Sequence, residues 1–209
     1  MNPFHLIYKP GAVVKHYLEN PDIIKALIFV LLPGILSVIG LVAYGFEISF
    51  FSEAFNFLYA VLAWIVASIL ISIIISLFSK KNTRKDFYGI ASAVSLTRFL
   101  GAAAVFLFLL VPLVMPAEIF GSVKDFQTGK ITLNQSVSAV ESSMESDTFV
   151  SSVPAVSAVL LLVVIFALLS IFVYYKVISQ KVNSNILVHF VALICFLFLD
   201  LLLVRAIGF

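Results

Sequence analysis

The chain has 209 residues, of which 62% are apolar and 11% are charged, and its formal net charge is +2. A soluble domain carries about a quarter charged residues, because water has to wet its surface. This composition therefore excludes an ordinary soluble protein and predicts a membrane protein whose surface contacts lipid. The small net charge and the lack of a basic stripe argue against nucleic acid as a partner.

The first 22 residues form a predicted N-terminal segment that is neither a plain loop nor a spanning helix. Within residues 11–20, apolar side chains recur at helical spacing: Val13, Val14, Tyr17 and Leu18. A short amphipathic helix beside lysines is typical of the cytoplasmic headgroup layer. Packing of the same helix on the protein's own bundle explains the pattern equally well. Asn2-Pro3 and Asn20-Pro21 each read as a helix N-cap followed by proline at the first helical position.

Five apolar stretches follow, each near the length of about 20 residues that a helix needs to cross the hydrocarbon core. They cover residues 23–44, 54–78, 88–112, 154–175 and 185–205. The first is longer than the apolar part of a signal peptide and lacks a cleavage site after it, so we expect it to be retained. The predicted fold is all-α: a polytopic five-transmembrane-helix bundle over residues 23–209, preceded by a short amphipathic interfacial helix.

Basic residues are distributed unevenly between the two ends of these predicted spans. Nine fall on one side: Lys9, Lys15, Lys25, Lys80, Lys81, Arg84, Lys85, Lys176 and Lys181. The other side has three: Lys124, Lys130 and Arg205. Because basic residues stay cytoplasmic, we expect a cell-membrane protein with its N-terminus in the cytoplasm and its C-terminus outside. The predicted cytoplasmic contact surface, for lipid or a protein partner, consists of Lys9, Lys15, Lys80, Lys81, Arg84 and Lys85.

The connection over residues 114–153 is the only long one in this scheme. It is rich in Ser, Thr, Gln and Glu from residue 128 onward, which predicts an extracytoplasmic loop that is partly ordered at best. Asn134 begins a glycosylation sequon, but such three-residue matches are common by chance. A spacer is the simpler interpretation of the loop, and a partner-binding surface is the alternative.

Two charged residues fall inside predicted spans, Arg98 in the third and Asp200 in the fifth. Their depths differ by roughly 9 Å at 1.5 Å per residue. Charges at depth are costly, and they usually pair or line a cavity. A coupling pair in a transport path is one interpretation, and a buried clamp between the two helices is the other. Since few polar residues accompany them, the sequence favours the clamp.

A stripe of small residues runs along the third predicted span at i, i+4 spacing: Gly89, Ala93, Thr97 and Gly101. Small residues at this spacing let two helix backbones approach closely. We therefore expect the third span to lie at the centre of the bundle. Packing inside the chain is the simpler interpretation, and assembly into a homo-oligomer through the stripe is the alternative.

The sequence has no arrangement typical of an enzyme, a metal site or a cofactor site. No His-Glu-x-x-His, Gly-x-Ser-x-Gly or phosphate-binding glycine loop occurs. The three histidines, His5, His16 and His189, are too scattered to predict a metal centre. We therefore expect no catalytic activity, no cofactor and no bound metal.

Three segments of the chain have a characteristic layout together with the five predicted spans: NPFHLIYKPGAVVKHYLENPDIIKALIFVLL, TRKDFYGIASAVSLTRFL and KVISQKVNSNILVHFVAL. This layout resembles the Yip family, the Ypt/Rab-interacting membrane proteins, in a minimal prokaryotic form. The resemblance implies a five-helix bundle with a cytoplasmic N-terminus and a non-enzymatic adaptor, scaffold or membrane-shaping function related to membrane trafficking or organisation. Eukaryotic members act with small GTPases and carry a long cytosolic N-terminal region, where this chain has 22 residues. A small transporter or channel using Arg98 and Asp200 is the alternative function.

Overall fold

The computed structural model describes the backbone of residues 2–78, 86–144, 147–182 and 186–206, and their side chains apart from residues 127, 147 and 199–206. Every regular element in these ranges is a helix, and they contain no strand. The elements are η1 (Pro3–Ile7), α1 (Pro10–Glu19), α2 (Ile23–Ala43), α3 (Phe50–Phe78), α4 (Phe87–Phe108), α5 (Val111–Val114), α6 (Ala117–Gln127), α7 (Leu133–Met144), α8 (Asp147–Lys181) and α9 (Ile186–Ala206).

Four helical stretches are long and apolar enough to cross a membrane. They are Ile23–Ala43, Phe50–Phe78, Phe87–Val114 and Thr148–Lys181. Each includes most or all of one of the first four predicted spans, and the fourth extends beyond its predicted span at both ends. In α9, the apolar stretch within the described side chains is Ile186–Phe198, which is too short to qualify as a span. The long apolar helices are compatible with a multi-pass membrane protein, and the fifth span stays a prediction.

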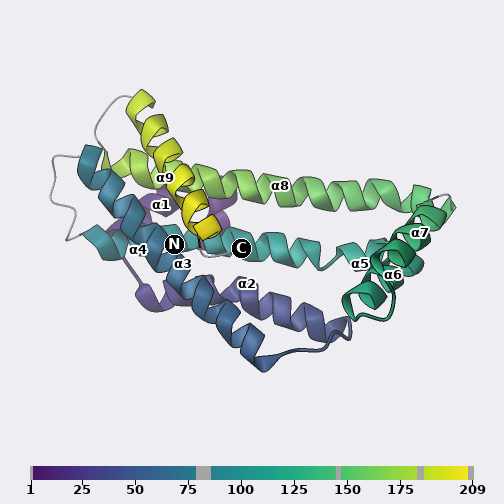
Figure 1. Ribbon diagram of the computed structural model, residues 1–209. Helices are drawn as coiled ribbons and strands as arrows, with labels where there is room; N and C mark the ends of the chain where they lie inside the picture. Colours follow the sequence, from purple (N-terminus) through teal and green to yellow (C-terminus); the bar gives the residue numbers. More distant parts are fainter. Residues whose placement is uncertain (1, 79–85, 145–146, 183–185, 207–209) are drawn as a thin grey trace.

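Helix α4 lies at the centre of the molecule. Figure 1 shows it running between α8 and α2, with α3 crossing obliquely, and α4 contacts α1, α2, α3 and α8. Its first three turns are almost entirely buried, from Gly89 to Thr97. Small side chains in this stretch let four neighbours approach one helix, because little volume separates the backbones.

The N-terminal arm, defined as η1 and α1 (residues 3–19), packs on the bundle. Leu6, Val13, Val14 and Tyr17 are buried, and α1 contacts both α4 and α8. Among the exposed side chains of the arm are Phe4, Ile7, Tyr8, Lys9 and Lys15. Packing of α1 on the protein's own helices, one of the two predicted alternatives, is therefore what the structure shows.

The two predicted Asn-Pro helix caps, Asn2-Pro3 and Asn20-Pro21, have different outcomes. Asn2 caps η1, since its side chain accepts a hydrogen bond from the backbone N–H of Phe4 at 3.0 Å. The Asn20-Pro21 prediction is wrong. Asn20 ends α1, and Asp22 caps α2 by accepting from the backbone N–H of Lys25 at 2.9 Å.

The connection over residues 114–153 is more ordered than its composition predicts. Most of it forms α6 and α7, which pack on each other at one end of the molecule, and α8 begins already at Asp147. The prediction of a partly ordered loop is therefore wrong. Apolar residues at helical spacing, among them Ile119, Phe120 and Val123, explain why α6 can pack.

Candidate functional site

Polar side chains of α4 hold the neighbouring helices in place. The hydroxyl of Thr97 is hydrogen-bonded to the hydroxyl of Tyr174 in α8 at 3.2 Å, and Trp64 Nε1 in α3 donates to the carbonyl of Ala91 at 2.8 Å. Ser92 Oγ accepts from the backbone N–H of Asp22 at 3.3 Å, ahead of α2. These bonds connect α4 to α8, to α3 and to the start of α2, and so fix the positions of these helices.

Arg98 follows Thr97 and is half-buried in α4. Its Nε atom is buried and has no hydrogen-bond partner among the described residues. An unpaired buried donor is costly, and a charged one more so. Arg98 therefore places one buried donor, unpaired within the described part of the chain, beside Thr97 in α4.

The backbone of α9 brings the chain near that point. Phe196 is fully buried, and its ring centroid lies 4.6 Å from that of Tyr174, the residue that contacts Thr97. Asp200 comes one helical turn after Phe196 on α9, but its side chain lies outside the described part of the chain. The ion pair between Arg98 and Asp200 thus stays a prediction.

The small-residue stripe divides into two parts. Gly89, Ala93 and Thr97 are buried, and a Cβ atom added at Gly89 would overlap the backbone carbonyl oxygen of Leu18 at the end of α1. Gly101 is half-buried, and no atom lies within 4 Å of an added Cβ. Close backbone approach therefore occurs at Gly89, against the N-terminal arm, and not at Gly101.

Of the predicted contact lysines, Lys9 and Lys15 are exposed on the N-terminal arm, and Lys15 forms a 3.9 Å ion pair with Glu19. Lys80, Lys81, Arg84 and Lys85 lie outside the described residues. The residue directly after them, Asp86, forms a 3.2 Å ion pair with Lys181 at the end of α8. Gln180 Nε2 also donates to the carbonyl of Gly11 at 2.8 Å. The arm, the start of α4 and the end of α8 therefore meet at one end of the bundle.

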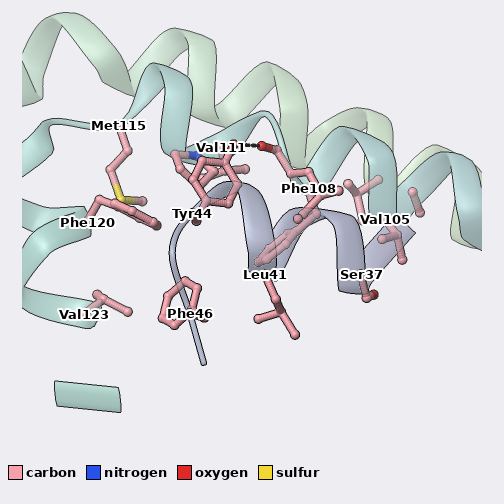
Figure 2. Close-up of a pocket in the computed structure, with 15 residues that line it drawn as sticks. Ser37, Leu41, Tyr44, Phe46, Val105, Phe108, Val111, Met115, Phe120 and Val123 are labelled. Carbon is pink, nitrogen blue, oxygen red and sulfur yellow. Dashed lines mark hydrogen bonds between the residues drawn. The ribbon is translucent and has the colours of Figure 1, made fainter. Parts of the chain in front are cut away.

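An apolar cavity of about 610 Å³ lies at the opposite end, between α2, the end of α4, α5 and α6. Figure 2 shows aliphatic and aromatic side chains around it, among them Leu41, Tyr44, Val105, Phe108, Met115 and Phe120. Sequence reasoning missed this site because it placed residues 114–153 in a loop. The helical spacing of apolar residues in α6 was the signal that could have indicated it.

The rim of the cavity carries one positive charge. Lys124 Nζ donates to the carbonyl of Tyr44 at 2.8 Å and lies 5.6 Å from the ring centroid of Phe46. The Tyr44 hydroxyl donates to the carbonyl of Leu109, the residue that ends α4. In the described part of the chain, Lys124 forms no ion pair, whereas the nearby Lys130 pairs with Asp125 at 3.4 Å.

No group of three or more His, Cys, Asp or Glu side chains that could hold a metal ion occurs within the described ranges. His189 Nε2 lies 2.8 Å from the carbonyl of Val182, a contact that positions the ring at the start of α9.

No family model, curated protein or solved structure matches the chain. The geometry of the described residues is therefore what a proposed function has to explain.

Proposed function

We propose that the protein is a non-enzymatic, Yip-like multi-pass membrane protein that acts as an adaptor, scaffold or membrane-shaping factor. Its N-terminal arm, together with the basic residues 80–85, would form the cytoplasmic contact surface for lipid and a protein partner. The observation that supports this most is the two-sided character of the arm. One face is buried on α4 and α8, while apolar and basic side chains occupy the exposed face.

The exposed part of the arm suits the boundary between lipid and water. Phe4 is 63% exposed and Ile7 is 59% exposed, and Tyr8 and Lys9 follow them directly. Apolar and aromatic side chains beside lysines are typical of segments that lie in the headgroup layer. Because the other face of the arm is docked, its position relative to the bundle is fixed, as a surface for recognition by a partner requires.

Photocrosslinking in intact cells tests this proposal. A photoreactive amino acid at Lys9 is expected to capture the same protein partner in repeated experiments, and the yield should fall when Lys15 and Lys80–Lys85 are neutralised. A probe at Lys130, at the opposite end of the bundle, serves as the matched control and should not capture that partner. Recovery of only lipid and self-crosslinks from Lys9 would contradict an adaptor function.

A small transporter or channel is the second candidate, and the buried, unpartnered Nε of Arg98 supports it. In a transport path, an intramembrane charge contacts water or the transported ion and therefore needs no partner within the protein. Flux through liposomes that contain the purified protein separates the two functions. Transport requires ion or solute flux that is lost on Arg98→Gln while the protein stays folded.

A further inference from the structure

We infer that the apolar cavity between α2, α4, α5 and α6 binds one hydrocarbon chain of an anionic membrane phospholipid, with Lys124 at the rim facing the phosphate. This site lies at the end of the bundle opposite the N-terminal arm. The inference therefore stands independently of the proposed adaptor function and requires only that the long apolar helices lie in a membrane.

The size and lining of the cavity fit a hydrocarbon chain. Its volume of about 610 Å³ falls within the range of about 300–1,000 Å³ typical of ligand pockets. Leu41, Val105, Phe108 and Met115 present only carbon and sulfur atoms to it. A cavity with so few polar partners does not hold ordered water, and such cavities take up apolar ligands.

Two side chains with hydroxyl groups line the cavity, Ser37 and Tyr44, and the rest of the lining side chains are apolar. The Tyr44 hydroxyl is already bonded to the carbonyl of Leu109, which satisfies an acceptor left free at the end of α4. Phe108 is 58% exposed and Val123 is 38% exposed, so the wall is continuous with the outer surface of the helices. A lipid chain can therefore enter sideways from the bilayer without crossing a polar barrier.

The positive charge of Lys124 favours a lipid with an anionic headgroup. Its ammonium group donates to one carbonyl, pairs with no carboxylate among the described residues, and has two further donors. Phe120 packs edge-on against Tyr44 at 5.3 Å and against Phe46 at 6.3 Å between ring centroids. Tyrosine is enriched at the membrane–water interface, where lipid phosphates lie. Lys124 thus lies beside Tyr44 and Phe46, two residues of the cavity lining, where the headgroup of a lipid with one chain in the cavity would lie.

The test uses the full chain in lipid nanodiscs that contain phosphatidylcholine and a small fraction of phosphatidylglycerol with a diazirine in the middle of one chain. After irradiation, mass spectrometry locates the labelled residues. Labelling is expected to concentrate on cavity residues such as Val105 and Phe108. Ala104→Phe, which fills the cavity, should reduce this labelling by about tenfold, while Ile39→Phe on the exposed face of α2 should leave it unchanged.

The headgroup is tested with two lysine variants: one at Lys124 in α6, and one at Lys130 in the connection between α6 and α7. Lys124→Gln should lower cavity labelling by about fivefold, since one lysine near an anionic lipid contributes about 1 kcal/mol. Lys130→Gln, which removes a lysine already paired with Asp125, should lower it by less than about twofold. Ser37→Leu provides a second filled cavity if Ala104→Phe does not fold.

Three results would overturn the inference. Equal labelling of the lipid-facing residues of α8 would show that the probe reports only bulk lipid. Equal labelling by a phosphatidylcholine probe would exclude the anionic headgroup, and equal losses for both lysine variants would remove Lys124 from the site. Each of these results leaves the adaptor proposal untouched, because none involves the N-terminal arm.

Discussion

Gly89 marks the point where the backbone of the N-terminal arm crosses α4. The oxygen that an added Cβ would overlap belongs to the backbone of Leu18, so no rotation of a side chain can relieve the overlap. We expect Gly89→Ala to lower the free energy of unfolding by about 1–3 kcal/mol. Gly101→Ala, which meets no atom within 4 Å, is the matched control and should leave stability equal or slightly higher. SDS titration of both variants measures this, and equal losses would contradict it.

Arg98 permits a prediction that separates a clamp from a transport site. If Arg98 pairs with Asp200, then Arg98→Asp or Asp200→Arg alone should destabilise the protein by about 3–5 kcal/mol, because each leaves an uncompensated buried charge. The double exchange should restore part of that loss. Thermal unfolding in detergent provides the readout. Full stability in both single variants would exclude the clamp.

The sequence identifies residues whose chemistry is unusual for their position, but it does not identify which residues meet a neighbouring helix in the folded chain. Arg98 and Asp200 are identifiable because charges in apolar runs are rare. Which of the four stripe residues meets a neighbouring backbone is not identifiable, since Gly89 and Gly101 have the same spacing and size. Their difference arises from the path of α1, which is a property of the folded chain.

The hydroxyl of Tyr17, in the N-terminal arm, makes the stability of the protein depend on pH. Burial, followed by the negative charge of Asp22, raises the pKa of the Tyr17 hydroxyl above its ordinary value of 10.0. Because the pKa is higher in the folded protein, this contribution to stability is fully present below pH 10.0 and is lost as the pH rises through the folded value. Tyr17→Phe should therefore weaken the alkaline loss of stability. Denaturation curves from pH 8 to about 11 test this, and an identical alkaline limb would contradict it.

Helix α1 is held on the bundle by the side chains of its buried face. Val14 is fully buried and Ala12 is exposed on the same helix. We expect Val14→Asp to release the arm, since an unpaired carboxylate is not tolerated in an apolar contact, and trypsin cleavage after Lys15 should accelerate about tenfold or more. Ala12→Asp adds the same charge without touching the contact and should be cleaved at the original rate. Unchanged cleavage of Val14→Asp would contradict a docked arm.

At the scale of elements, apolar periodicity and length predicted α2, α3, α4 and α8, because spanning helices have strong compositional signals. The predicted span began at residue 23, as α2 does, but its capping residue was wrong, because Asn20-Pro21 has cap chemistry while Asp22 makes the hydrogen bond. Helix α7 was missed because Ser, Thr and Glu dominate residues 128–152, and a polar composition conceals short amphipathic helices. Helix α6 was missed because residues 114–153 were treated as one loop, although apolar residues recur at helical spacing in it. The apolar cavity, which α6 completes, was missed with them.

At the scale of the whole molecule, the sequence predicted a central α4, and its contacts with α1, α2, α3 and α8 agree with that prediction. The arrangement of the two ends was not predictable. Ion pairing between Asp86 and Lys181 and docking of the arm define one end, and α6 with α7 defines the other. The orientation of these ends across a membrane follows from the distribution of basic residues and stays a prediction.

Cysteine accessibility in intact cells tests the account most directly, because it reports the side of the membrane on which the arm, the α6–α7 end and the C-terminus lie. In a Cys195→Ala background, single cysteines replace Lys15 or Lys130, and a third is added after Phe209. A membrane-impermeant maleimide should label the cysteines at 130 and after Phe209 in intact cells, and the cysteine at 15 only after permeabilisation. Labelling of position 15 in intact cells, or protection of the C-terminal cysteine, would contradict the five-span arrangement with a cytoplasmic arm.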